Sequence, residues 1–289
     1  MWLFVVGAAL ATEPLKPPPD FRIYYDSLSV ARVNPLGLQE KFNLHARWRL
    51  LDKPVESTLF GDTWASVGAT AAATPAWARG GVFAQVSPIS ILRLTASYEG
   101  IGYFGTFDQV QGFADPATAD YSPKALEAGD PRAVAGTVLS LEGRVQAKVG
   151  PIAVRNTTLG ARYNLAVDAG DVAFVDQIFD AMIPTKGWTI QNDTDVLYVA
   201  GRFSGGLRWT HLAPQLDSEE ARQRAQIDRL GPLLSYRIVE DRGSGFDAAT
   251  LFLLPQWHLR HPYRAGQEVS QAIPYVVLGF GFVGDAKPW

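Results

Sequence analysis

The chain has 289 residues, of which 47% are hydrophobic and 19% are charged, and its formal net charge is −3. This charge gives no global reason to expect a nucleic-acid partner. The absence of cysteine excludes disulfides, thiolate metal sites and cysteine nucleophiles together. Beyond the N-terminus, no run of about eighteen apolar residues is present to form a membrane helix, so the apolar residues are dispersed along the chain.

The N-terminus carries the features of an export signal. Trp2–Leu10 is a short apolar stretch, and Ala9-Leu10-Ala11 has the small-x-small form of a signal-peptidase site. We therefore expect a signal peptide over residues 1–11, although the usual basic n-region is missing and a buried N-terminal strand is the alternative. Residues 12–21 are proline-rich and predict an extended periplasmic lead-in.

Strict alternation of apolar and polar residues is the dominant pattern of the remaining chain. Within residues 139–149, the odd positions are apolar or small and the even positions are polar. A strand with this pattern has one apolar face and one polar face.

The same pattern predicts strands at 22–32, 40–51, 57–71, 77–87, 90–103, 134–149, 151–166, 188–200, 202–213, 229–240, 248–260 and 272–283. Most of these segments are longer than the roughly five or six residues of typical soluble strands, and about ten residues suffice for a tilted strand to cross a bilayer. A soluble all-β domain is the alternative, but a closed barrel of about twelve strands is too wide for its own side chains to fill. The apolar faces are therefore expected to face lipid. We predict an antiparallel transmembrane β-barrel over 22–283 and a periplasmic tail over 284–289.

The connections alternate between tight and long. Tight turns are expected at 87–88, 150–151 and 201–202, and long loops at 104–133, 167–187, 214–228 and 261–271. Short turns are typical of the periplasmic side and long loops of the extracellular side, which also places both termini in the periplasm.

The long loops differ in character. Residues 108–133 predict an irregular excursion, and residues 218–229 a short helix capped near Asp217 or Ser218. Residues 172–187 are apolar enough to form either a further strand outside the membrane or a plug in the barrel mouth.

Over residues 22–283 the chain resembles Gram-negative outer-membrane β-barrel proteins of the twelve-stranded size class. One face of its last strand looks like the C-terminal signal of such barrels, although the chain continues to Trp289; this face comprises Val276, Leu278, Phe280 and Phe282. The resemblance implies outer-membrane lipid and the β-barrel assembly machinery as partners.

The residues give little support for reaction chemistry, so we predict no catalytic residue, no metal and no cofactor. The twelve-stranded size class includes a phospholipase with a lipid-facing serine and histidine, but here only His211 is expected to face outward, without a matching motif. His258 and His261 are three residues apart, which on a strand predicts opposite faces. The side-chain oxygen atoms of Asn192, Asp193 and Asp195 could bind calcium; the alternative interpretation is that these residues are solvated at the end of a loop.

The polar faces predict a basic lumen. Taking them as inward gives ten basic residues, namely Arg47, Arg49, Arg93, Arg144, Lys148, Arg162, Arg202, Arg208, Arg237 and Arg260. The opposing acidic residues are Glu99, Glu142, Asp193 and Asp195. The leading interpretation is a passive outer-membrane channel for small solutes, preferably anionic. The alternatives are a plugged structural or interaction barrel, whose charges pair across strands, and an acyl hydrolase.

Overall fold

The structure is a computed structural model that describes residues 20–51, 59–60, 62–106, 110–176, 178–240, 244–265 and 273–287. The expected signal peptide and most of the lead-in lie outside these residues. Twelve long strands form the main sheet: β1 (Phe21–Val33), β2 (Gly37–Arg49), β3 (Trp64–Ala73), β4 (Trp77–Ile89), β5 (Leu92–Phe104), β7 (Ala133–Val149), β8 (Ile152–Leu165), β11 (Lys186–Ala200), β12 (Phe203–Pro214), β13 (Ile227–Arg237), β14 (Asp247–Arg260) and β15 (Tyr275–Asp285).

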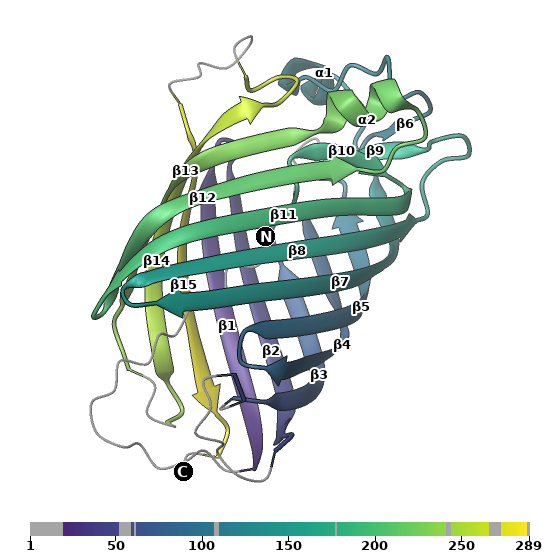
Figure 1. The fold of residues 1–289 in the computed structure, drawn as a ribbon. Helices are drawn as coiled ribbons and strands as arrows, with labels where there is room; N and C mark the ends of the chain where they lie inside the picture. The colour runs from purple at the N-terminus through teal and green to yellow at the C-terminus, as the bar shows by residue number, and fades with distance from the viewer. Residues whose placement is uncertain are drawn as a thin grey trace.

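These strands form one closed antiparallel barrel (Figure 1). Each strand pairs with its neighbour along the main sheet, and β1 closes the ring by pairing with β15. This closing seam runs from the pair Tyr24 and Asp285 to the pair Val33 and Val276. The predicted number of strands is confirmed, but the third strand begins at Trp64, seven residues after its predicted start.

The exterior of the barrel is apolar. The side chains that point away from the lumen include many large exposed hydrophobic residues, such as Leu44, Val82, Leu141, Val196 and Leu253. Closure of the ring lets neighbouring strands pair their backbone N–H and C=O groups without water, and the apolar exterior is suited to contact with lipid. These are the two requirements for crossing a bilayer with strands. Within the described residues, no helix is long and apolar enough to cross a membrane.

The two ends of the barrel differ, and we name them by their connections. At the turn end, short connections join β4 to β5, β7 to β8 and β11 to β12. At the loop end, longer connections carry β6 (Gly112–Phe113), α1 (Pro123–Glu127), β9 (Ala173–Asp176), β10 (Ala181–Pro184) and α2 (Glu219–Ala225). Figure 1 shows these elements gathered over one opening of the barrel.

The loop-end opening is filled by an apolar plug. β9 and β10 form a hairpin, and β6 adds a third strand to its edge. All residues of both hairpin strands are buried. Phe174, Phe179 and Ile183 belong to one apolar cluster with inward-facing residues of the barrel wall, including Trp77 and Tyr163. The segment 172–187 therefore forms both a small extra sheet and a plug.

The other loops also form ordered structure. α2 begins after Ser218, whose side chain accepts a hydrogen bond from the Ala221 amide, as the sequence predicts. The expected irregular excursion at 108–133 instead contains β6 and α1. Tyr121 from this segment packs in a second apolar cluster with Met182 of β10 and Leu216. Together these loops cap the plug.

Candidate functional site

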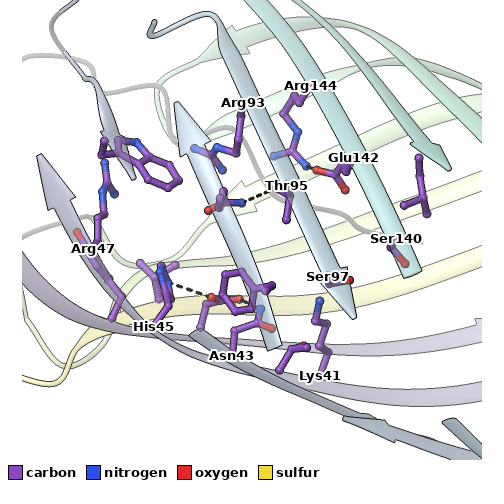
Figure 2. Close-up of a pocket in the computed structure, with 18 of the residues that line it drawn as sticks. Lys41, Asn43, His45, Arg47, Arg93, Thr95, Ser97, Ser140, Glu142 and Arg144 are labelled. Atoms are coloured by element: carbon purple, nitrogen blue, oxygen red, sulfur yellow. Dashed lines mark hydrogen bonds and ion pairs between the residues drawn. The ribbon is translucent and has the colours of Figure 1, made fainter. Parts of the chain in front are cut away.

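A polar chamber of about 320 Å³ lies in the lumen, beneath the plug and toward the turn end. Its walls are inward-facing residues, mainly of β1, β2, β3, β4, β5 and β7. The charged residues that line it are Asp26, Lys41, Arg47, Asp62, Arg93, Glu142 and Arg144. Four basic residues therefore face three acidic residues in one confined space. Figure 2 shows Arg93 and Arg144 on neighbouring strands.

An aromatic group organises the wall formed by β1 to β4. The guanidinium of Arg47 lies 4.1 Å from the centre of the Trp64 ring, and that of Arg93 lies 4.9 Å from it. Arg47 also pairs with Asp62 at 2.9 Å. Tyr24 stacks on His45, with 5.7 Å between ring centres. The indole thus holds two like charges by cation–π contact, which is a favourable arrangement for arginine.

The wall formed by β5 and β7 is polar. Arg93 and Arg144 are direct cross-strand partners, and both point inward. Arg144 pairs with Glu142 at 3.1 Å and donates from Nε to the Thr157 hydroxyl at 3.3 Å. These contacts orient the Arg144 guanidinium along the wall.

A second group of charges lies outside the chamber, on β8, β11 and β12. Asp195 is fully buried and accepts hydrogen bonds from both Arg155 and Arg208, the latter at 2.6 Å from Nε. Arg208 also approaches Asp193 at 3.8 Å, and the Thr210 hydroxyl donates to Asp193 at 2.7 Å. Ion pairing of this kind satisfies buried charge and was the alternative interpretation of the lumen.

The structure places seven of the ten predicted lumen bases on inward-facing positions. These are Arg47, Arg49, Arg93, Arg144, Lys148, Arg208 and Arg237, with Lys148 exposed at the turn end. Arg202 instead lies in the turn before β12 and pairs with Glu240 at 3.0 Å. Arg260 is exposed at the loop end, where it contacts Gln223 and Gln226 beside α2. All four predicted lumen acids face inward. Glu142 lines the chamber, Glu99 is fully buried beside Arg79 at 3.2 Å, and Asp193 and Asp195 are buried with the charges of β8, β11 and β12.

The prediction for Arg162 is wrong, because this residue points outward. On β8 the buried residues are Ala153, Arg155, Thr157 and their odd-numbered successors, so Arg162 lies on the exposed face. The rule that the polar face is the lumen face fails here because the loop-end half of β8 packs against the apolar plug. Because the predicted inward and outward faces of β8 were exchanged, Arg155 was not predicted to face the lumen, although its side chain points inward. Lys41 and Arg79 were also missed, although the alternation along β2 and β4 places both on the inward face.

Both interpretations of residues 192, 193 and 195 are corrected. Asp193 and Asp195 are buried in the lumen, whereas Asn192 faces outward, so the three do not converge on one ion and are not a solvated loop end. On the lipid-facing surface, Asn192 forms a closed hydrogen-bond network with Asn156, Thr158 and Thr194. In this network every side-chain N–H and O–H donates to another member.

His211 faces outward near the loop end, as predicted. Its Nδ1 lies 2.8 Å from a carboxylate oxygen of Asp228 on the adjacent strand. This pair resembles the base and orienting acid of a hydrolase, but the outward neighbours of His211 on β11 and β12 are Asn192, Trp209 and Ala213. These three neighbours supply no serine hydroxyl to activate.

His258 and His261 were expected on opposite faces, but the structure brings them together. β14 ends at Arg260, and the following turn places the His261 ring 5.0 Å from the His258 ring. Potential ligand atoms of both histidines and of Asp180 lie within 4.8 Å of one another. However, Arg264 Nε lies 2.7 Å from the Asp180 carboxylate, and His261 Nδ1 accepts from two backbone amides at 3.1 Å. Because both ring nitrogens of His261 are already engaged and a guanidinium faces the Asp180 carboxylate, the geometry does not favour a metal site.

We call Asp180, His261, Arg264 and Asn34 the clasp. Asp180 lies in the plug hairpin, His261 and Arg264 follow β14, and Asn34 lies in the turn between β1 and β2. His261 Nε2 lies 3.1 Å from the Asp180 carbonyl, and Arg264 donates to Asn34 Oδ1 at 2.7 Å. The clasp thus fastens the plug to two connections of the barrel rim.

The closed barrel, its apolar exterior and its polar lumen define a transmembrane β-barrel of the outer-membrane type. The sequence matches no protein-family model. It also matches no curated protein.

Among solved structures, the chain is similar to a KdgM porin, with 9% identity, a TM-score of 0.39, and coverage of 90% of this chain and 98% of that one. It is similar to the translocator domain of the autotransporter NalP from Neisseria meningitidis, with 9% identity, a TM-score of 0.40, and coverage of 93% and 89%. It is also similar to the Acinetobacter baumannii outer membrane protein Omp33, with 11% identity, a TM-score of 0.36, and coverage of 92% and 97%.

Proposed function

We propose that this protein is an outer-membrane channel for the passive passage of small polar solutes, in a conformation whose outer mouth is closed by the plug. The observation that carries the proposal is the polar chamber of about 320 Å³, which holds seven charged side chains inside a lipid-facing barrel. A barrel that served only as a scaffold gains nothing from a polar cavity of this size, because unfilled space weakens packing.

The orientation follows from the asymmetry of the two ends. The turn end faces the periplasm, together with both ends of the described chain, and the loop end faces outside. The outward row on β15 formed by Val276, Leu278, Phe280 and Phe282 supports recognition by the β-barrel assembly machinery during insertion.

Passage requires the plug to move. The plug hairpin is held by apolar packing against the wall and cap and by the polar contacts of the clasp, whereas the barrel wall is held by continuous strand pairing. A small sheet that is not part of the closed ring of strands opens at lower cost than the ring itself. We therefore expect the hairpin to move as a gate while the wall remains closed.

The preference for anions rests on a smaller group than the sequence predicted. Arg155 and Arg208 are balanced by Asp195 and Asp193, so the charge that a solute meets is that of the chamber. There, Arg93 and Arg144 lie side by side, and basic residues exceed acidic residues by one. A confined excess of positive charge raises the local concentration of anions.

A planar bilayer under a KCl gradient tests both parts of the proposal. Asp180→Asn should weaken the clasp and raise the open fraction above that of the wild type. Arg93→Ser with Arg144→Ser should lower the chloride preference seen in the reversal potential. Arg162→Ser is the matched control, because Arg162 points to lipid. Cation preference in the wild type would rule out the anion proposal.

The second candidate is a permanently plugged structural or interaction barrel. It is favoured by the apolar packing of Phe174, Phe179 and Ile183 against the wall, and by the ordered cap of α1 and α2. The same bilayer experiment separates the candidates: absence of conductance in both the wild type and Asp180→Asn would support the plugged barrel.

A further inference from the structure

The Arg93–Arg144 pair places two like charges directly opposite each other in the sheet. Directly opposed residues of neighbouring strands have Cβ atoms roughly 5 Å apart, and like charges there are destabilising. Glu142 pairs with Arg144 at 3.1 Å, and Arg93 stacks on Trp64. Arg93 is additionally repelled by Arg47, which stacks on the same indole, and is attracted by Asp62, Glu142 and Asp26. An anionic group between the guanidinium groups would relieve this repulsion, and arginine is suited to hold an oxyanion with two hydrogen bonds.

The β2–β3 wall offers a different kind of group to the same chamber. Asn43, Trp64 and Thr70 line it and are 4%, 3% and 5% exposed. Within the part of the chain that the structure describes, Asn43 Oδ1, Trp64 Nε1 and Thr70 Oγ1 have no hydrogen-bond partner. Buried polar atoms are normally paired, so these atoms mark positions where a solute can donate or accept.

The Arg93–Arg144 pair and the unpartnered atoms of the β2–β3 wall are not all at the same height of the chamber. Trp64 is at the turn end of β3, close to Arg93, whereas Thr70 and its strand partner Asn43 lie six residues further along β3. Six strand residues span roughly 20 Å, so Thr70 and Asn43 lie beyond the reach of a small solute held at Arg93 and Arg144. Of the three unpartnered atoms, the Trp64 Nε1 is the one beside the arginines.

We propose that the chamber is a binding site for a small hydroxylated organic oxyanion. Its carboxylate or phosphate group lies against Arg93 and Arg144, and one of its hydroxyl groups accepts a hydrogen bond from the Trp64 indole N–H beside Arg93. This inference deepens the proposed channel and rests on the same chamber, but binding itself does not require conduction.

Calorimetric titration of the purified, detergent-solubilised protein tests the proposal, with gluconate and glucose 6-phosphate as the carboxylate and phosphate probes. Sorbitol is the uncharged comparison for gluconate. We expect at least one anionic probe to bind saturably and at least tenfold more tightly than sorbitol. A response to only one probe identifies which oxyanion the site takes.

Two variants locate the site. Arg93→Gln with Arg144→Gln should weaken binding of the anionic probe at least tenfold, and Trp64→Phe should weaken it severalfold, because it removes the indole N–H while leaving an aromatic ring and both arginines in place. Arg162→Gln, on the lipid-facing surface, should leave the affinity unchanged. Gel migration before and after boiling shows whether each variant is folded.

Binding of neither anionic probe, or equal binding of gluconate and sorbitol, would overturn the proposal. So would an equal loss of affinity in Arg162→Gln. If the double arginine variant does not fold, the comparison of gluconate with sorbitol on the wild type and the Trp64→Phe titration still decide. Binding without conductance would retain this site and reject the channel, whereas conductance without binding would do the reverse.

Discussion

The network of Asn156, Thr158, Asn192 and Thr194 shows how single residues carry polarity on a lipid-facing surface. Each amide oxygen accepts two hydrogen bonds, and each amide nitrogen donates two, all within the network. A polar group in hydrocarbon is costly when it is unsatisfied. The closed network removes that cost without a partner molecule, so its presence does not indicate a docking surface.

Because the network is closed, the effects of substituting its members on the free energy of unfolding should be strongly non-additive. Asn192→Leu alone should destabilise the barrel by about 1–3 kcal/mol, because it removes four of the six hydrogen bonds of the network and leaves polar groups unsatisfied in lipid. Adding Asn156→Leu should cost much less than a second such loss, since leucine is favourable at a lipid-facing position. Unfolding in detergent or lipid, analysed as a double-mutant cycle, measures the coupling. Strictly additive losses would show that the four side chains act independently.

The outward position of Leu141 on β7 leads to a second prediction at the residue scale. Leu141 is 47% exposed on the outer surface of β7. Leu141→Arg should destabilise the barrel by about 2–4 kcal/mol if the residue lies near the bilayer midplane. Leu141→Phe is the control, because an aromatic residue remains favourable in contact with lipid. Similar unfolding free energies for the two variants would contradict the lipid-facing position.

At the scale of elements, the plug hairpin and its clasp respond to pH. Burial lowers the pKa of His261, which also faces Asp180, Arg264, Arg229 and His258. A histidine with a depressed folded pKa contributes full stability above its unfolded value of about 6.5 and loses it as the pH falls further. Protonation at Nδ1 would also break the two hydrogen bonds that this atom accepts from backbone amides.

We therefore expect acidification from pH 7.5 to 5 to loosen the clasp and raise conductance in a bilayer. Asp180 is not the responding group, because although burial opposes ionisation, Arg264 and His261 hold its pKa below the usual 3.8. His261→Phe should abolish the response between these pH values. A wild-type conductance that is constant over this range would exclude His261 as a pH-sensitive part of the clasp.

The elements also show how far sequence reasoning extends. Strand number, strand length and the helix after Ser218 were predictable, because alternation and capping are local properties. The face of Arg162 was not predictable, because β8 faces a plug supplied by a distant segment rather than water. The approach of His258 to His261 depends on the position where β14 ends. Contacts between separate loops, such as that of Arg264 with Asn34, leave no periodic pattern in the sequence and could not be predicted from it.

At the scale of the whole molecule, the seam between β1 and β15 is fastened at both ends. At the turn end, Arg22 pairs with Asp285 at 2.8 Å, and both side chains are more than nine-tenths buried. At the loop end, Asn34 contacts Arg264 and also donates to the Ile273 carbonyl at 3.2 Å. These contacts join the first strands to the last.

Breaking the turn-end fastening should have a large effect. Arg22→Ala leaves a buried carboxylate without its arginine and should destabilise the barrel by about 3–5 kcal/mol. Arg202→Ala is the control, since its pair with Glu240 is exposed and worth about 0–1 kcal/mol. The temperature at which unboiled protein loses its anomalous gel migration reports the difference. Equal temperatures for the two variants would show that the seam does not limit stability.

The clasp gives barrel closure and mouth closure a common final step. Asn34 comes from the first hairpin, Asp180 from the hairpin between β8 and β11, and Arg264 from the last loop. These three groups meet only after β15 has found β1, so a chain still waiting for its last strand has both an open sheet with two unpaired edges and an unfastened plug. We therefore expect the wall and the entrance to close together during biogenesis, so that a complete barrel with an open, leaking mouth does not accumulate as an intermediate.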